Sequence, residues 1–325
     1  MRAAFYETSG PAKEVLKVGE LPTPQPGPGE VRVKLAFSGI NPSDVKSRSG
    51  ASNRGWNFPL TIPHSDGAGT VDAVGAGVDA ALNGRRVWVY NGQWERAHGT
   101  AAESIVLPAA QAVPLPDNVS LEAGASIGIP LMTAFHAVAA CGSLIGKSVI
   151  VSGAAGSVGL YATQLARIAG ARVIALISGA AKGDIARKAG AHEVVNYREE
   201  DVGARVRALT GGGGASFIID LDAAGNGKHY GQWLEFGGKA VIYGSNARDV
   251  TVPFGPMISN MVTLVFFIVY RLPPAQMRET TAGITQLFEQ GALVHPEAAI
   301  YALDDIVAAH ERVEAGANAK VLIRL

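Results

Sequence analysis

Residues 147–177 read KSVIVSGAAGSVGLYATQLARIAGARVIALI, and this stretch decides the fold. The β-branched run at 148–151 is typical of a strand that is buried on both faces. A glycine-rich turn follows at 153–159, and apolar residues then recur at helical spacing until Gly170. Residues 171–177 are predicted to form a second buried strand. Strand, glycine turn, helix and strand within about thirty residues form the context that a dinucleotide-binding fingerprint requires.

The turn between the first strand and the helix has the residues that a pyrophosphate needs. Gly156 lets the backbone approach the phosphates, and Gly159 lets the helix pack closely on the strand. The match to G-x-G-x-x-G is imperfect, because Ala154 stands in the place of the first glycine. A turn that only reverses the chain is the alternative. We predict that the cofactor's phosphates meet Ala155, Gly156, Ser157, Val158 and Gly159, where the unpaired N–H groups of the first helical turn would face them.

The end of the second strand indicates which dinucleotide is bound. An NAD-specific site usually has Asp or Glu there, bonded to the ribose hydroxyls. Here the strand is followed by Ser178, and Lys182 lies four residues later. Because a hydroxyl and a cation suit a 2′-phosphate, we predict NADP(H). The alternative is that Lys182 is a solvated residue that opens the next helix.

Composition sets limits on the class of protein. A chain of 325 residues supports two domains, and 48% hydrophobic against 17% charged residues predicts a large core. The formal net charge of zero argues against a protein that binds nucleic acid or anionic membrane through a general positive field. The single cysteine, Cys141, excludes internal disulfides and cysteine-rich zinc sites, and it fits a reducing cytoplasm. The first residues have no signal-peptide core, and the longest apolar run, 261–270, is about half a membrane span.

The chain changes character after its first 120 residues. Short strands predicted at 31–37 and 86–90, and a strand with a glycine turn at 67–78, indicate a β-barrel-like module rich in glycine and proline. A helical passage at 121–140 separates this module from a region in which strands and helices alternate. That alternation predicts an α/β fold with a doubly wound sheet of about six strands. The six strands are expected at 148–151, 171–177, 194–196, 217–220, 240–243 and 261–270.

The tail is predicted to return to the β module. It has helical patterns at 281–291 and 303–316 and a last strand at 320–325, which would make the module discontinuous in sequence. The four glycines at 211–214 are interpreted as a surface turn, because a strand and not a helix follows them.

Five ordered motifs resemble one family. They are GINPSD at 39–44, PHSDGAG at 63–69, GTAAE at 99–103, GIPLMTA at 128–134, and AGA with NYREED between 189 and 201. The chain resembles the zinc-free quinone oxidoreductases, the zeta-crystallin group of the medium-chain dehydrogenase/reductase superfamily. The resemblance runs nearly end to end, and several motifs in order are more specific than the glycine turn alone.

The resemblance implies a fold and an activity. It implies a GroES-like β-barrel domain from residues 1–122 and 270–325, and a Rossmann domain with a doubly wound parallel sheet from residues 123–269. An NADPH-dependent reductase that works in the cleft between the domains is expected. A homodimer formed by edge pairing of the Rossmann sheets is also expected, and the apolar run 261–270 suits such an edge.

Zinc is not expected. Alcohol dehydrogenases of the superfamily hold a catalytic zinc on Cys, His and Cys. This chain has Asn41 near the first of these positions, Ser65 at the second and no cysteine at the third. His64 is one place away from a ligand position, and we interpret it as a loop or pocket-wall residue.

Without a metal, the protein must position the reactants and stabilise the oxyanion that forms. By resemblance, Asn41 lies near the nicotinamide, Thr133 faces the same end of the cofactor, and Arg48 orients or stabilises a substrate oxygen. Better-known members have Tyr where this chain has Lys46, whose ammonium could polarise a carbonyl. The alternative is that Lys46 and Arg48 are a solvated loop pair. Asp44 is expected to hold the loop.

The resemblance also assigns the rest of the cofactor site. Ser178, Lys182 and Tyr197 are expected around the 2′-phosphate and adenine, although Tyr197 is alternatively an ordinary capping aromatic. Gly244 and Ser245 are expected beside a ribose. The remaining candidates are Phe266 and Phe267 at the nicotinamide, for which core packing or the dimer edge is equally open, and Asn318, near the family's C-terminal G-K stretch.

The predicted function is an NADPH-dependent quinone reductase in the cytoplasm. A reductase of 2-alkenals and other α,β-unsaturated carbonyls is the alternative, since both reactions deliver a hydride to a conjugated acceptor. A 2-enoyl-thioester reductase would want a basic patch that the sequence does not show. An RNA-binding or structural role, as in zeta-crystallins, is a further alternative that the neutral charge weakens.

Overall fold

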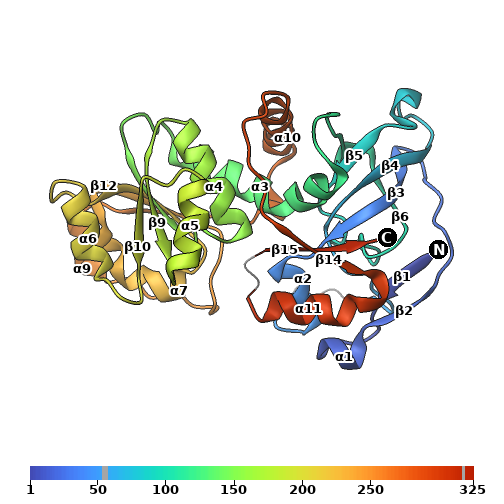
Figure 1. The fold of residues 1–325 in the computed structure, drawn as a ribbon, viewed down its shortest axis with the longest axis horizontal. Helices are drawn as coiled ribbons and strands as arrows, with labels where there is room; N and C mark the ends of the chain where they lie inside the picture. Colours follow the sequence, from blue (N-terminus) through green and yellow to red (C-terminus); the bar gives the residue numbers. More distant parts are fainter. Residues whose placement is uncertain (53–57, 317–318) are drawn as a thin grey trace. The chain divides into compact units, whose positions relative to one another are not determined.

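The computed structural model describes residues 1–52, 58–316 and 319–325. The chain forms two compact units, one from Met1–Ile129 with Thr281–Leu325 and the other from Pro130–Thr280. Both ends of the chain, blue and red in Figure 1, belong to the same unit. The prediction that the tail returns to the β module is therefore confirmed. The proposed domain boundaries after residues 122 and 269 stay a prediction.

The second unit is built on a six-stranded sheet in which all pairs are parallel. The strand order is β10-β9-β8-β11-β12-β13, so the order reverses between β8 and β11. This is the order of a dinucleotide-binding sheet, and the predicted doubly wound architecture is confirmed. The strands are β8 (Ser148–Ser152), β9 (Arg172–Ile177), β10 (Glu193–Asn196), β11 (Ala215–Asp220), β12 (Leu234–Ile242) and β13 (Thr263–Phe266).

Helices connect these strands and cover the sheet. Helix α4 (Ser157–Ile168) packs on β8 and β9, and α5 (Ala180–Lys188) packs on β9 and β10. The central strands are fully buried at Val149, Ile150 and Val151, as expected for a parallel sheet with both faces covered. The other helices of this unit are α6 (Val202–Leu209), α7 (Ala223–Asn226), α8 (Tyr230–Trp233) and α9 (Phe254–Ser259).

The sixth strand is shorter than the sequence predicts. Instead of residues 261–270, only Thr263–Phe266 form β13, and 269–271 form a 3₁₀ turn. The reason is the length of its neighbour: β12 ends at Ile242, whose carbonyl accepts the last bond from the N–H of Phe267. The glycines at 211–214 form a turn between α6 and β11, as predicted.

Two helices cross the division between the units. Helix α3 (Leu121–Cys141) confirms the predicted helical passage, and the division falls beside Pro130. Helix α10 (Pro274–Glu289) leads back to the first unit. Within the described residues, α3 is the one helix long and apolar enough to cross a membrane. However, 78% of its most apolar window is buried in the protein, as in the core helix of a globular fold.

The first unit is mostly β-structure, as predicted. Its main sheet has the order β14-β15-β3-β4-β5-β7, with β6 also paired to β3, and a separate pair is formed by β1 and β2. The pairs are antiparallel except for β14 with β15. The strands are β1 (Arg2–Phe5), β2 (Lys17–Glu20), β3 (Glu30–Gly39), β4 (Asp66–Val74), β5 (Arg86–Val89), β6 (Ser104–Pro108), β7 (Ala112–Pro114), β14 (Ala298–Ala302) and β15 (Lys320–Arg324).

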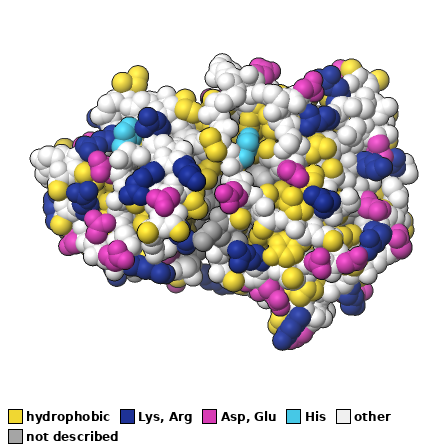
Figure 2. All heavy atoms as spheres, in the orientation of Figure 1, with side chains coloured by type: hydrophobic (Ala, Val, Ile, Leu, Met, Phe, Trp, Pro, Cys, Tyr) yellow, Lys and Arg dark blue, Asp and Glu magenta, His cyan; other side chains and the backbone are white. Residues whose placement is uncertain are grey.

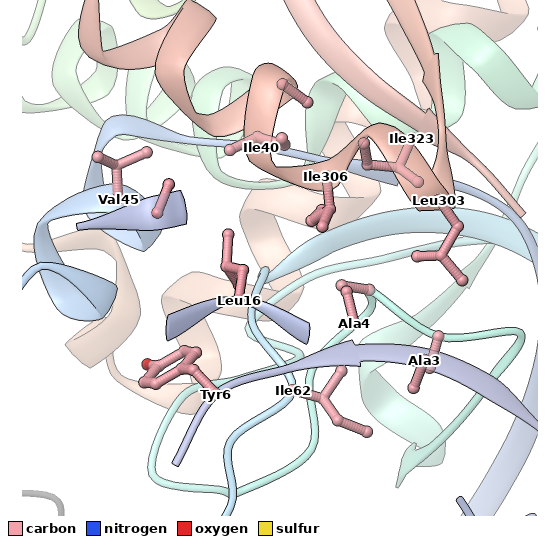
Figure 3. Close-up of a cluster of buried hydrophobic side chains, with 14 of the residues drawn as sticks. Ala3, Ala4, Tyr6, Leu16, Ile40, Val45, Ile62, Leu303, Ile306 and Ile323 are labelled. Atoms are coloured by element: carbon pink, nitrogen blue, oxygen red, sulfur yellow. The ribbon is translucent and has the colours of Figure 1, made fainter. Parts of the chain in front are cut away.

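The C-terminal tail supplies part of the core of this unit. Figure 3 shows Leu303, Ile306 and Ile323 from the tail packed with Ala4 and Ile62 from the other end of the chain. These side chains are at most 4% exposed. The tail is therefore integral to the unit. The helices that surround this cluster are α1 (Ala12–Val15), α2 (Pro42–Arg48) and α11 (Ile306–Glu314).

Basic and acidic side chains are interspersed over the face of the molecule that Figure 2 shows. This distribution agrees with a formal net charge of zero. A surface of mixed charge lacks the broad positive field that proteins use to attract nucleic acid.

The close packing of α4 on β8 yields a test. A Cβ on residue 159 would lie 2.2 Å from the Gly153 carbonyl oxygen and 2.8 Å from the Ala154 Cα, and neither backbone atom can move freely. We expect Gly159→Ala to lower the free energy of unfolding by about 1–3 kcal/mol, measured by urea denaturation. Gly213→Ala is the control, because its added Cβ meets nothing closer than 3.9 Å. Equal losses in both variants would contradict the packing argument.

Candidate functional site

The turn between β8 and α4 leaves backbone donors free for an anion. Gly156 is the N-cap of α4, and no side chain in the described part of the chain caps it. The first helical bond runs from the Leu160 N–H to the Gly156 carbonyl. The N–H groups of Ser157, Val158 and Gly159 therefore lack a carbonyl in the preceding turn. A cluster of free N–H groups at the positive end of a helix dipole suits a phosphate.

The glycines of this turn have separate physical roles. Gly153 has a φ of +60°, which favours glycine, and a Cβ there would lie 2.0 Å from Leu221 Cδ2. Gly153 thus makes the sharp turn, although Ala154 occupies the place of the motif's first glycine. Gly156 is exposed, and a Cβ there would meet only the Gly153 oxygen at 3.3 Å. Gly159 provides the close contact between helix and strand.

The predicted 2′-phosphate residues lie together at the ends of β9 and β10. The Lys182 ammonium donates to the Ser178 hydroxyl over 3.2 Å. The Tyr197 N–H donates to the Ile177 carbonyl at the end of β9, and the Tyr197 side chain is 51% exposed. A hydroxyl, a cation and an accessible phenol ring therefore share one edge of the sheet. Their roles at a 2′-phosphate and adenine remain predictions.

A cavity of about 590 Å³ opens in this unit where the strand order reverses. Parallel sheets bind ligands outside the carboxyl ends of their strands at such a point. Tyr197 belongs to its lining, which places this residue on a ligand-sized cavity. Other lining residues come from the ends of three strands or directly follow them: Ser152, Leu176, Leu221 and Asp222.

Asp220 ties the two central strands together beneath this cavity. It is fully buried, and it accepts hydrogen bonds from the Ser152 hydroxyl, from Tyr230 Oη at 2.5 Å and from Asn226 Nδ2 at 2.9 Å. Burial and the nearby Asp220 carboxylate raise the pKa of Tyr230. The phenol therefore stays protonated and keeps donating. The sequence prediction missed Asp220 and Tyr230, and the only signal for them was the position of Asp220 at a strand end.

Two of the predicted nicotinamide residues, Thr133 and Phe267, lie next to His136 of α3. Phe267 follows β13, and its ring lies against that of His136 with 4.6 Å between centroids. Thr133 is 5% exposed and lies one helical turn before His136 on α3. Phe266 is 59% exposed, because neighbouring residues of a strand point to opposite faces. Thr133 and Phe267 are thus both neighbours of His136, whereas Phe266 turns outward.

Gly244 and Ser245, the predicted ribose residues, follow the end of β12. Gly244 lies so close to the β11 end that a Cβ there would be 2.3 Å from the Leu221 carbonyl oxygen. Ser245 is half-buried next to it. Their predicted contact with a ribose remains a prediction, and Asn318 lies outside the described residues.

The first unit has a buried polar network around Asn41. Lys320 Nζ lies 3.1 Å from Asp66 Oδ2, and the two side chains are 2% and 0% exposed. Asn41 bridges them: its Nδ2 donates to Asp66 Oδ2 over 2.7 Å, and its Oδ1 accepts from Lys320 Nζ over 2.7 Å. Asp66 Oδ1 accepts the backbone N–H of Ile129. Breaking a buried, bonded ion pair by removing one partner costs about 3–5 kcal/mol.

A second chain of hydrogen bonds starts from the backbone of Asp66. The Thr100 hydroxyl must donate to the Asp66 carbonyl, 2.6 Å away, so the Ser38 hydroxyl donates to Thr100. Ser38 then accepts from His64 Nδ1, which leaves His64 Nε2 to accept from His310 Nε2 over 2.8 Å. The carbonyl at one end thus determines the tautomers of both histidines, provided that both are neutral.

Burial keeps these histidines neutral. Burial, the neighbouring His310 and the Lys320 ammonium lower the pKa of His64 well below its ordinary value. Burial and the Arg48 guanidinium lower the pKa of His310. His64 is 0% exposed with a φ of +78°, so this loop residue is part of the interior and not a pocket wall. Its hydrogen bonds offset the strain of the left-handed backbone.

The predicted catalytic residues on α2 point in different directions. Lys46 is exposed, whereas Arg48 is 0% exposed and donates to the Gly10 carbonyl and to Glu314. This pairing favours a structural role for Arg48, and the two residues do not form the solvated loop pair considered above. Asp44 accepts the Asn41 N–H and closes a capping box, so it holds the start of the helix as expected.

The residues around Asn41 do not fit a zinc ion. Both carboxylates that contact Asn41 are already engaged: Asp66 is bonded to an ammonium, an amide and a backbone N–H, and Asp44 accepts the Asn41 N–H. The only cysteine of the chain, Cys141, is a buried thiol in the other unit, and burial raises its pKa to about 12. Across residues 1–52, 58–316 and 319–325, no three His, Cys, Asp or Glu side chains gather as a metal site.

Comparison with known proteins agrees with the fold of both units. Residues 27–117 match the alcohol dehydrogenase GroES-like domain, and residues 157–287 match the zinc-binding dehydrogenase family. The quinone oxidoreductase of Homo sapiens is 30% identical over 331 residues, which cover 100% of this chain and 98% of that protein. The chain belongs to the quinone oxidoreductase family. The resemblance inferred from five motifs, and with it the GroES-like and Rossmann architecture, is confirmed.

Solved structures of similar proteins align with this chain over its whole length. Escherichia coli quinone oxidoreductase, solved in complex with NADPH, aligns with a TM-score of 0.88 at 25% identity, and all of both chains is covered. A mycobacterial quinone oxidoreductase aligns with a TM-score of 0.85 at 29% identity, again over both whole chains. An NAD-dependent alcohol dehydrogenase reaches 0.90 at 30% identity. Because relatives of both cofactor types share the fold, the fold alone does not select NADPH.

The buried histidines predict how stability changes with pH. An unfolded histidine has a pKa near 6.5. Since the folded pKa values of His64 and His310 are lower, the unfolded chain binds more protons below pH ~6.5. Stability should therefore fall as the pH drops from 6.5, by up to about 1.4 kcal/mol per pH unit for each histidine. Urea denaturation between pH 5 and pH 8 measures this slope.

Matched variants assign the slope to the pair. His64→Gln with His310→Gln should flatten the pH dependence below pH 6.5, because both titrating groups are removed. The remaining histidines with lowered pKa values contribute equally to both proteins and do not affect the difference. His98→Gln, at an exposed position, should leave the slope as it is. An unchanged slope in the double variant would refute the assignment.

Proposed function

We propose that this protein is an NADPH-dependent quinone reductase that works without a metal. The observation that carries the proposal is the bond from Lys182 to Ser178, directly after β9, in the same unit as the uncapped first turn of α4. Curated relatives over the full length are quinone oxidoreductases, and relatives have been solved in complex with NADPH. A cytoplasmic site of action agrees with a chain that has a single cysteine.

The residues of the second unit fit this cofactor. The N–H groups of Ser157, Val158 and Gly159 would hold the pyrophosphate, and Lys182 with Ser178 would hold the 2′-phosphate. Tyr197 would cover the adenine at the cavity. Gly244 and Ser245 would border a ribose, and Thr133 with Phe267 would face the nicotinamide. When bound, NADPH supplies a hydride, and with one proton from water the quinone becomes a hydroquinone.

The first unit would supply the donor for the developing negative charge. Asn41 has an amide that is oriented by two buried partners, Asp66 and Lys320. A preorganised N–H donor stabilises an oxyanion without reorganisation at the moment of reaction. Lys46 is exposed on the same helix that Asn41 caps, so its ammonium is free to approach an acceptor. Reduction of 2-alkenals uses the same groups and remains the alternative.

A panel of acceptors tests the proposal. Loss of NADPH absorbance at 340 nm should be fast with naphthoquinones and ortho-quinones and slower with 2-alkenals, and NADH should serve as a poor donor. Efficient reduction of alkenals with inert quinones would favour the enone reductase. No turnover with any acceptor would remove the proposed activity. Equal rates with NADH would contradict the assignment of the 2′-phosphate site.

The 2′-phosphate site has its own test. Lys182→Glu replaces the cation by a carboxylate in the first turn of α5, so the Kd for NADPH should rise about tenfold or more while that for NADH stays within about twofold. Titration of nucleotide fluorescence measures both constants. Lys188→Glu is the matched control at the other end of α5, where it is exposed and should change neither. Parallel losses for both nucleotides would exclude a specific contact with the phosphate.

We also propose a homodimer formed along β13. This strand is the edge of its sheet, with β12 on one side only. Exposed apolar side chains accompany it: Phe254 is 77% exposed, Ile258 59%, Met261 64% and Ile268 45%. An unpaired edge flanked by apolar residues suits pairing with the same edge of a second copy.

Light scattering tests the dimer. The wild-type protein should have twice the mass of one chain, and Ile258→Glu with Met261→Glu should convert it to a monomer by placing charges on the apolar edge. Ile145→Glu is the control, since Ile145 is 81% exposed and precedes β8, which β11 and β12 separate from β13. A monomeric wild-type protein at micromolar concentration would rule out the proposal.

A further inference from the structure

Lys320 is a buried cation that the sequence analysis did not assign to any role. It is the first residue of β15, and its side chain is 2% exposed. The carboxylate that forms an ion pair with it belongs to Asp66, which starts β4 and is also buried, at 0% exposed. A buried ion pair contributes little to stability compared with apolar packing, so its presence calls for another explanation.

The strand register places Lys320 opposite Asn41. Strands β15 and β3 are antiparallel, with Leu322 opposite Gly39, and the bond from the Ile40 N–H to the Val321 carbonyl extends the pairing. Two residues further along the same register, position 320 meets position 41. The contact between the ammonium and the Asn41 amide is therefore built into the sheet.

Gly39 makes room for this contact. It lies between the two charged residues, opposite Asp66 on β4 and opposite Leu322 on β15. A Cβ on Gly39 would be 3.1 Å from Asp66 Cβ, 3.1 Å from Lys320 Cε and 2.2 Å from the Ala125 carbonyl oxygen. Only glycine leaves the space in which the lysine side chain reaches across the sheet.

The donors and acceptors permit one orientation of the Asn41 amide. An ammonium has no acceptor, so the atom of Asn41 that faces Lys320 must be Oδ1. A carboxylate that is bonded to a lysine accepts, so Nδ2 faces Asp66. One of the two Nδ2 hydrogens is used by this bond. Within the described residues, the second hydrogen has no protein acceptor.

We infer that Lys320 is a positioning residue for the reaction, which orients the Asn41 amide and polarises it so that the remaining N–H binds the acceptor's oxygen. A cation on the carbonyl oxygen of an amide draws electrons from its nitrogen and strengthens the N–H as a donor. The lysine thus does indirectly what a metal ion does by direct coordination. The inference deepens the proposed quinone reductase activity and rests on it.

The charge-neutral double variant separates this role from a structural one. Lys320→Met alone leaves Asp66 unpaired, so lost stability would account for lost activity. Asp66→Asn with Lys320→Met leaves no buried charge, and an amide at position 66 allows the Asn41 amide to turn over. We expect this variant to be folded, with Kd for NADPH within about twofold of wild type and kcat lower by about tenfold or more. A kcat within about twofold of wild type would overturn the inference.

Two further variants keep the test decisive if the double variant does not fold. Lys320→Arg keeps the cation and should retain kcat within about fivefold, whereas a folded Arg variant with a larger loss would count against a role of the charge. Arg324→Met removes a cation from the exposed end of the same strand and should leave kcat unchanged. In the Asn41→Ala background, the neutral double variant should lower kcat no further, because the lysine acts through that amide; additive losses would contradict this.

A measurement without turnover distinguishes failure of the inference from failure of the proposed activity. The side-chain amide of Asn41 gives two hydrogen signals on one nitrogen in NMR spectra, which are identified by their loss in Asn41→Ala. In wild type, the strong bonds to Lys320 and Asp66 should shift these signals from those of exposed asparagines, and the shift should diminish in the neutral double variant. Signals at the positions of exposed asparagines in wild type would overturn the inference, even if quinone reduction is observed. If no quinone is reduced but the shift is present, the proposed activity fails alone.

Discussion

The ion pair between Lys320 and Asp66 is the most deeply buried ion pair among the described residues, and the polar contacts around Asn41 depend on it. Its partners are 254 residues apart in sequence, yet they meet at 3.1 Å with almost no exposure. Because neither charge is solvated, each depends on the other, and separating them would leave a bare charge in the interior. The pair therefore links β15 of the tail to β4 of the N-terminal region. Asn41, Gly39 and the backbone at Ile129 all take positions set by this pair.

The second unit depends on a steric condition. Helix α4 starts close against the turn that follows β8 because Gly159 has no side chain, and its first turn is left without a side-chain cap. Asp220 then holds the ends of β8 and β11 through hydrogen bonds from side chains on both sides. A fixed strand pair, an uncapped helix and a cavity at the reversal point are the elements that a dinucleotide needs. Hydride transfer without a metal requires mainly such positioning and a hydrogen-bond donor for the oxyanion.

Much of the fold was predictable from local patterns. Strand β8, the helix after it, β9 and the helical passage at α3 were placed within a few residues, since burial on both faces leaves an unmistakable apolar run. The ends of the strands were harder to predict. Strand β13 stops at Phe266 because its neighbour β12 stops, and no property of residues 267–270 indicates this end. The candidate site residues divide in the same way, into those that local sequence predicts and those that distant contacts decide. Ser178 and Lys182 lie four residues apart, and the structure brings them together as predicted. Arg48 and Lys46 share a helix, but one is buried and the other is exposed, which depends on Gly10 and Glu314 far away in sequence.

The sequence by itself determined the alternation of strand and helix, the glycine corner, the identity of the cation at the end of β9 and the family. These properties depend on residues within one or two turns of each other, where periodicity and the missing Cβ of glycine act directly. The tertiary structure alone decided the strand order, the depth of Asp220, the tautomers of His64 and His310, and the pairing of Lys320 with Asn41. Each of these depends on strand register between distant segments. A register shift of one residue would turn Lys320 to the other face of its strand, so its role follows from pairing and not from its place in the chain.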